Sequence, residues 1–411
     1  MHPQLSHIYI SHTMPVSRRR TLIFVFLLER IQRGRRRRKR CWVHPLNQRR
    51  RQQCDFYHLV AELRLDSQCH HLYFRMSAEQ MDELLSIIGP ELTRQSTNYR
   101  AAIEPKQRLA VGLRYLASGD SMVSLAFSYR LGHATVMNSV HMVCAAIEKV
   151  MMERFLPRPT QDTWKEVAQG FCEKWNFPNS LGAIDCKHII QAPPLSGSQF
   201  FNYKKTFSIV LLALVDADYR FRFIQVGDFG RTCDGGVYAS SDLGRGMDTN
   251  TLHVPPSTSL PGAAHLGDVP FVMVGDAAFQ LKPFLMRPYP GANLSYKKRI
   301  FNYRLSRARM VVENAFGILS SRWRIFLNRI NLQTKTVDTL VMAACILHNF
   351  LLVPSENHRL LDEAEQLGRH MAPVRNMVGN RASTEACNVR EVFCTYFTSP
   401  EGSVSWQKRM V

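Results

Sequence analysis

The stretch Leu181-Gly-Ala-Ile-Asp185-Cys-Lys-His188 contains a short apolar run that ends on an acidic residue. A second run, Phe271-Val-Met-Val-Gly-Asp276, ends in the same way. Short apolar runs bounded by turn residues are typical of buried strands. We therefore expect Asp185 and Asp276 at the ends of two strands, where carboxylates from neighbouring strands can come together.

Two further acids complete a candidate metal site. Glu313 lies in the arginine-rich helical pattern of residues 305–316, and Asp234 lies in the turn Cys233-Asp-Gly-Gly236. Mg²⁺ and Mn²⁺ prefer carboxylate oxygens, and a pair of such ions can activate water and stabilise the leaving oxygen in phosphodiester cleavage. We take Asp185, Asp234, Asp276 and Glu313 as candidate ligands, although each acid alone could be a turn former or half of a helical ion pair.

The net charge of +20 is concentrated near the N-terminus. Residues 1–53 contain 14 Lys or Arg and one acid, Glu29, so residues 54–411 are only mildly basic. The run Arg35-Arg-Arg-Arg-Lys-Arg40 predicts a nuclear-import signal or a phosphate-binding arm, with a solvated, disordered tail as the plainer alternative. A chain this basic favours a polyanion such as DNA as its partner.

The ten cysteines are scattered and include no Cys-x-x-Cys pair. This spacing argues against a structural zinc site and a secreted disulfide framework, and it fits a reducing compartment. The apolar stretch of residues 22–28 is far shorter than the ~20 residues that a membrane span needs. We expect a soluble intracellular protein without a membrane segment.

The pattern from about residue 55 to residue 177 is helical. Pro105 and Gly119 mark the start and end of one helix, and a short second helix reaches Tyr129. A turn at Leu131-Gly132 and a third helix over residues 134–152 give the spacing of a helix-turn-helix. Its candidate recognition residues lack Arg and Lys, which leaves an ordinary helical bundle as the alternative. These residues are His133, Thr135, Asn138 and His141.

The pattern changes near Pro178. Residues 181–184, 209–215, 221–226 and 271–274 predict strands, with a hairpin turn over residues 216–219. Helical patterns follow from about Asn302 and Thr336. Strands followed by helices indicate an α/β or α+β core.

Several segments resemble the DDE nuclease domain of the PIF/Harbinger transposase superfamily and its domesticated derivatives. They are Gly182-Ala-Ile-Asp185-Cys-Lys-His188, Phe201-Asn-Tyr-Lys-Lys205, Val274-Gly-Asp276, Phe301-Asn-Tyr-Arg304, Phe316-Gly-Ile-Leu319 and Cys345-Ile-Leu-His348-Asn349. The resemblance implies an RNase H-like α/β fold with a DDE triad at Asp185, Asp276 and Glu313. It also implies a further metal-site carboxylate at Asp234, a helix-turn-helix character in the preceding region, and a separate Myb/SANT-like partner for DNA targeting.

The chain departs from that pattern at two places. Cys233-Asp234-Gly235 replaces the usual His-Asp-Ser, and Ala277-Ala278-Phe279 replaces the usual Gly-Tyr after the second Asp. Groups next to metal ligands orient them, so these changes favour a silent nuclease as the alternative function.

Other candidates carry weaker signals. His188 could support the metal ligands, and Arg309 could pair with Glu313 or contact phosphate. Lys204 and Lys205 could line the DNA path, although solvated lysines are more common. We interpret His348 as a buried structural histidine and Trp323 as a core residue in preference to a base-stacking one.

We therefore predict a nuclear, and also cytoplasmic, divalent-metal-dependent DNA endonuclease. The alternative is a catalytically silent scaffold on DNA or chromatin. The expected division is a basic tail (1–53), a helical region (54–178), an RNase H-like DDE endonuclease domain (179–355) and a polar C-terminal tail (356–411).

Overall fold

The computed structural model describes residues 43–96, 101–191, 197–366, 372–373 and 382–409. The chain divides into two units, Met1–Arg49 and Arg50–Val411. The described part of the first unit contains helix α2 (Pro45–Gln48). The basic run Arg35–Arg40 and the apolar residues 22–28 lie outside the described residues. The predicted domain boundaries stay predictions.

The second unit begins with helices. They are α3 (Arg50–Gln53), α4 (Leu59–Leu63), α5 (Ser67–Phe74), α6 (Ala78–Leu92), α7 (Pro105–Ser118), α8 (Met122–Ser128), α9 (His133–Phe155) and α10 (Gln161–Trp175). The predicted helix between Pro105 and Gly119 is confirmed, because α7 ends at Gly119 in the left-handed region with φ of 70°. A Cβ at this position would also meet Asn328 Nδ2 at 2.3 Å, but that exposed side chain can move, so the positive φ is what favours glycine here.

A mixed sheet follows, with strand order β3-β2-β1-β6-β7. Its strands are β1 (Ser180–Ile190), β2 (Ser208–Val215), β3 (Phe221–Phe229), β6 (Val272–Val274) and β7 (Leu285–Met286), and β8 (Ala372–Pro373) pairs with β1. Strands β1 and β2 pair antiparallel, as do β2 and β3, while β6 is parallel to both β1 and β7. The predicted α/β fold class is confirmed.

Strand β2 shows why this sheet is covered on both faces. All of its residues are buried. Ile209, Leu211 and Ala213 belong to one hydrophobic cluster, while Val210 and Leu212 belong to another. Successive side chains of a strand point to opposite faces, so a continuous apolar run such as this one needs cover on each side.

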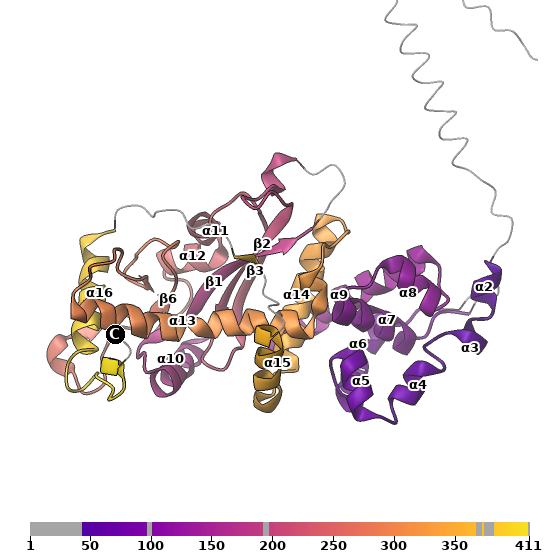
Figure 1. Cartoon of the computed structure of the whole chain (residues 1–411), viewed down its shortest axis with the longest axis horizontal. Helices are drawn as coiled ribbons and strands as arrows, with labels where there is room; N and C mark the ends of the chain where they lie inside the picture. Colours follow the sequence, from indigo (N-terminus) through magenta and orange to yellow (C-terminus); the bar gives the residue numbers. More distant parts are fainter. Residues whose placement is uncertain (1–42, 97–100, 192–196, 367–371, 374–381, 410–411) are drawn as a thin grey trace, which may run out of the picture. The chain divides into compact units, whose positions relative to one another are not determined.

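Helices and short elements supply that cover. They are α11 (Asp234–Ser240), α12 (Asp242–Asp248), α13 (Tyr296–Arg322), α14 (Thr334–Phe350), α15 (Pro354–Gln366) and α16 (Thr384–Tyr396), with a small hairpin of β4 (Thr258–Ser259) and β5 (Asp268–Val269). Helix α13 runs beside the sheet (Figure 1), and its buried residues share the cluster of Ala183 and Ile189 on β1. Within the described residues, no helix has the length and hydropathy needed to cross a membrane.

Strand β1 differs from the prediction in length. We expected Asp185 to end a strand, but β1 continues to Ile190 because it pairs with β2 along Ala183–Ile190. A bulge between Ser180 and Gly182 changes the alternation of the strand. Gly182 has φ of 141°, and a side chain there would meet Leu214 and the Val215 carbonyl at 2.9 Å. Asp185 therefore lies inside the strand, on the same face as Ala183 and Ile189.

The C-terminal segment, predicted as a polar tail, contributes to the core. Phe393 and Phe397 are fully buried, and their rings lie 5.4 and 5.1 Å from that of Phe177. Arg304 of α13 is also buried, and it donates to Gly402 O at 3.2 Å and Gln407 Oε1 at 2.9 Å. These contacts attach the C-terminal segment to α13.

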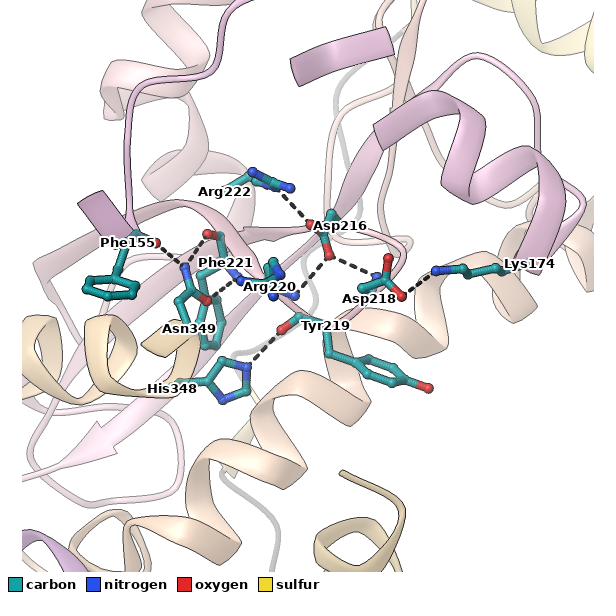
Figure 2. A network of polar contacts seen from close by, with 10 residues as sticks. All are labelled: Phe155, Lys174, Asp216, Asp218, Tyr219, Arg220, Phe221, Arg222, His348 and Asn349. Carbon is teal, nitrogen blue, oxygen red and sulfur yellow. Dashed lines mark hydrogen bonds and ion pairs between the residues drawn. The ribbon is translucent and has the colours of Figure 1, made fainter. Parts of the chain in front are cut away.

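The hairpin turn between β2 and β3 was predicted over residues 216–219, and the structure confirms it (Figure 2). Asp216 Oδ1 accepts the N–H groups of Asp218 and Arg220, both at 2.9 Å. Its other oxygen pairs with Arg222 Nε at 2.8 Å. One buried carboxylate thus organises the turn.

Helix α14 holds this hairpin through two polar side chains (Figure 2). His348 Nε2 donates to Tyr219 O at 2.8 Å, and burial, followed by the charge of Arg322, lowers the pKa of His348 to about 3. His348 is thus a buried neutral histidine, as interpreted above. Asn349 accepts from Phe221 N and donates to Phe221 O and to Phe155 O at the end of α9. Its carboxamide therefore joins α14, β3 and α9.

Asn349→Ala tests how much this junction stabilises the chain. The substitution leaves three buried backbone groups without their partner, so we expect a loss of about 2–4 kcal/mol in the free energy of unfolding. Chemical denaturation of the full chain measures it. Asn293→Ala, at an exposed loop position, is the control and should change stability by less than about 0.5 kcal/mol. Equal effects of the two substitutions would contradict the assigned role.

Candidate metal centre

Three of the four predicted metal ligands come together. One carboxylate oxygen from each of Asp185, Asp234 and Asp276 lies within 4.8 Å of the others. Asp185 is on β1, Asp276 follows β6 by two residues, and Asp234 is the first residue of α11 and not a turn residue as expected. Glycines at positions 235 and 236 suggested a turn, but they are the second and third residues of that helix.

The unequal lengths of β1 and β6 bring Asp185 and Asp276 together. Strand β6 ends at Val274, which pairs with Ala183, whereas β1 continues for seven more residues. Beyond this pair the chain turns away from the sheet, and Asp276 Oδ1 accepts the N–H of Ala278 at 2.8 Å. Asp185 therefore lies beside the point at which β6 ends, and the side chain of Asp276 reaches it there.

Burial and repulsion from neighbouring carboxylates raise the pKa of Asp234 and Asp276. Asp185 is 4% exposed and Asp234 only 1%. Burial, followed by the charges of Asp185 and Asp276, raises the pKa of Asp234 to about 8. Burial and then Asp185 also raise the pKa of Asp276. Like charges held close together in a buried place disfavour ionisation, and a nearby cation reverses that preference.

The residues fit a divalent cation. Asp234 Oδ1 is buried and has no hydrogen-bond partner among the described residues, and a bound cation would satisfy it. Oxygens bound to one Mg²⁺ lie within about 4.2 Å of each other, twice the Mg–O distance, which is close to the observed spacing. Three carboxylates and no sulfur or imidazole ligand favour hard ions such as Mg²⁺ or Mn²⁺.

Lys187 is a site residue that the sequence interpretation missed. Its Nζ lies 2.8 Å from Asp185 Oδ2, an ion pair whose angles are not those of a hydrogen bond. Burial acts to lower the pKa of Lys187, but the charges of Asp185 and Glu313 outweigh it and the pKa is raised. The signal was present in the sequence, because residues two apart on a strand share a face.

Glu313 stands apart from the three clustered acids. It lies on α13 as predicted, but its side chain is 43% exposed and pairs with Arg309 Nη1 at 2.7 Å. Its charge acts on Lys187, and that of Arg309 acts on Asp276. Glu313 and Arg309 are therefore close enough for their charges to act on the site, although Glu313 is not one of the clustered acids. The assignment of Glu313 as the third catalytic residue stays a prediction.

The remaining candidates lie towards the end of β1. His188 Nδ1 hydrogen-bonds Ser208 Oγ at 3.0 Å and contacts none of the three acids in this way among the described residues. Burial, followed by the charges of Lys204 and Lys187, lowers the pKa of His188 to about 4, so the ring is neutral at pH 7. Its predicted role in supporting the metal ligands remains untested.

Lys204 and Lys205 sit on an exposed turn that Asn202 organises. Asn202 Oδ1 accepts from Lys204 N at 3.0 Å and from Thr206 N at 3.1 Å. The side chains of both lysines are exposed, which suits contact with a backbone phosphate but equally suits solvation. Trp323, by contrast, is fully buried, so it is a core residue and does not stack on a base.

Comparison with known proteins gives a family match and two relatives. Residues 184–349 match the DDE superfamily endonuclease family. The Arabidopsis thaliana protein ALP1-like is 26% identical over 304 residues, covering 71% of this chain and 72% of the relative. The Arabidopsis thaliana protein antagonist of like heterochromatin protein 1 is 27% identical over 290 residues, covering 68% of this chain and 72% of the relative. No solved structure matches significantly.

The raised pKa of Asp234 predicts a pH-dependent stability of the metal-free protein. Between an unfolded pKa near 3.8 and a folded pKa of about 8, the folded chain holds the extra proton, so stability falls as pH rises through this window. Asp234→Asn removes that loss. Its melting temperature in EDTA, relative to the wild type, should therefore rise from pH 5 to pH 8 and level off above.

Asp162→Asn, which changes an exposed acid on α10, is the matched control for charge. Its difference from the wild type should stay flat over the same range. If the melting-temperature difference between Asp234→Asn and the wild type also does not change with pH, burial and neighbouring carboxylates do not raise the pKa of Asp234.

Lys187 should weaken cation binding, because its ammonium group competes for Asp185. Lys187→Met removes that charge while keeping the length of the side chain. We expect Mn²⁺ to bind about tenfold more tightly, which corresponds to about 1.4 kcal/mol. Mn²⁺ titration followed by electron paramagnetic resonance measures it, with Lys165→Met at an exposed position of α10 as control. Weaker binding by Lys187→Met would show that Lys187 holds Asp185 in place instead.

Proposed function

We propose that the chain is a divalent-metal-dependent endonuclease that cleaves DNA phosphodiester bonds, because residues 184–349 match the DDE superfamily endonuclease family. The match confirms the predicted relationship to Harbinger transposase-derived nucleases. The observation that carries the proposal is the convergence of Asp185, Asp234 and Asp276 within 4.8 Å at the end of β6.

In this proposal Asp185 and Asp276 hold the cations and Asp234 completes the carboxylate set. Divalent cations bound there would activate a water molecule and stabilise the charge that develops on the phosphate. A cation also favours the ionised form of Asp234, so the group that is protonated in the metal-free site becomes a ligand.

We propose that the cationic side chains of the site bind the substrate. Lys187 and Arg309 border the acids from β1 and α13. Guanidinium and ammonium groups at this position can bind the phosphate oxygens that flank the cleaved bond. When Arg309 moves from Glu313 to a phosphate, Glu313 becomes available as the third acid of the DDE triad. Lys204 and Lys205 on the exposed turn then extend the DNA path.

A second candidate function is a silent nuclease that acts as a scaffold in the nucleus. Two observations favour it: the ion pair of Glu313 with Arg309, and the ammonium group of Lys187 against Asp185. One relative is named as an antagonist of a heterochromatin protein. By analogy, we propose chromatin association for this chain, with a Myb/SANT-like partner supplying DNA targeting. A cytoplasmic pool and the oligomeric state stay outside this proposal.

Cleavage of supercoiled plasmid with Mn²⁺ or Mg²⁺ tests the enzyme. We expect nicking by the wild type, and a loss of about 100-fold or more in Asp185→Asn and Asp276→Asn, because removal of one ligand withdraws several kcal/mol of charge stabilisation. Glu313→Gln should lose activity to a similar extent if it joins the triad. Asp162→Asn is the control and should nick as the wild type does. If the wild type and Asp185→Asn nick the plasmid equally, the proposed endonuclease function is wrong and the scaffold function remains.

A further inference from the structure

A cavity of about 450 Å³ lies in the helical region, away from the acids of the metal centre. Two helices and a connection contribute to it: the chain between α6 and α7, the start of α7 and the first half of α9. The residues that matter for its chemistry are Arg94, Arg108, Thr135, Asn138 and Met142. Its volume falls within the ~300–1,000 Å³ of sites that bind small ligands or parts of larger ones.

Two arginines converge on one sulfur atom in this cavity. Arg94 Nη2 lies 3.8 Å from Met142 Sδ, and Arg108 Nη1 lies 3.7 Å from the same atom. A thioether is a weak acceptor and cannot balance two positive charges. Guanidinium groups that meet without an acid between them repel each other, so an anionic third component would stabilise the arrangement.

Arg108 is the arginine of this cavity that most needs a negatively charged partner, because it is buried. It is 9% exposed, and its Nε has no hydrogen-bond partner among the described residues. Burial, followed by the charge of Arg94, lowers the pKa of Arg108, and no carboxylate contributes to the shift. Within the part of the chain that the structure describes, neither arginine forms an ion pair with an acid. A buried cation without a counter-ion is costly, which is why such cations are normally paired.

The neutral residues of the cavity suit a phosphate group. Guanidinium forks bind phosphate oxygens with two parallel hydrogen bonds. Thr135 and Asn138 lie one turn apart on α9, where a hydroxyl and a carboxamide can each donate to phosphate. Helix α9 begins after Gly132 without a side-chain cap, so the partial positive charge of its first turn is not cancelled locally.

We propose that this cavity binds a backbone phosphate of DNA and seats the first half of α9 on the duplex. The inference rests on DNA being the partner of the proposed function. The exposed α9 residues His133, Asn138 and His141 include no Lys or Arg, which taken alone argues against DNA binding by this helix. The positive charges come from neighbouring elements: Arg94 follows α6 and Arg108 lies on α7. Phosphate contacts of this kind position a helix and leave sequence recognition to other groups.

The test is binding of a fluorescein-labelled duplex to the full chain by anisotropy, in EDTA so that cleavage does not intervene. Arg94 is exposed, so Arg94→Ala should fold normally. We expect it to weaken binding about five- to tenfold and to lower the slope of log K against log salt by about one, the value for one lost phosphate contact. Arg108→Met, which preserves apolar packing, should act in the same direction.

Lys149→Ala is the matched control, because it removes one positive charge from the distal half of α9, where Lys149 pairs with Glu91. It should change affinity less than twofold. Equal effects of Arg94→Ala and Lys149→Ala would overturn the proposal.

A measurement with inorganic phosphate distinguishes the two possible ligands of the cavity, a backbone phosphate of DNA and a free phosphate ion. If phosphate raises the melting temperature of the wild type but not of Arg94→Ala, and does not compete with DNA, the cavity is a small-phosphate site and the DNA proposal is wrong. Failure of the nuclease does not affect this test, since binding is measured without metal. Cleavage by the wild type with unchanged binding by Arg94→Ala would overturn this inference alone.

Discussion

Repulsion among three closely spaced carboxylates, two of them buried, is the constraint on which the rest of the site depends. Asp185, Asp234 and Asp276 come from a strand, a helix start and a loop, and nothing local holds them together. The sheet and its covering helices must supply the free energy that keeps them close. Lys187 and Arg309 offset part of the repulsion without filling the cluster. The sheet and its helices therefore hold the three carboxylates in place, and the carboxylates supply the negative charge that attracts a cation. A preorganised cation site requires both.

The scaffold achieves this through the length of β1. This strand pairs with β2 along its whole second half, and β6 covers only its beginning. Asp185 and Lys187, which lie beyond the end of β6, share the face of β1 that packs against α13. The contacts of Asn349 connect the sheet to α9, so the proposed phosphate cavity and the metal centre belong to one unit of the chain.

Much of this was predictable from the sequence, because much of it is local. Apolar runs, Pro105, Gly119 and the hairpin turn identified the strands and helices, and Asp185 and Asp276 followed from their positions. Lys187 was missed although the alternation of β1 placed it beside Asp185. The pairing of Glu313 with Arg309 was one of the two alternatives that their spacing on a helix offered. The exposure of Glu313 could not be predicted, since it depends on how α13 lies against the sheet. The cavity at Arg94 and Arg108 was equally hidden, because it depends on how α9 packs against α7 and the connection that precedes it.

The burial of Phe393 and Phe397 against Phe177 has a consequence for how the protein is made. The central strand is synthesised early, but the last aromatic residues that cover its surroundings emerge about 200 residues later. At ~5–20 residues per second, the ribosome needs about 10–40 s to span that interval. During this time an unfinished core exposes apolar surface, which makes an incomplete chain prone to aggregate. A chain that stops before Thr384 would contain every acid of the site but would lack the helix that covers Phe177.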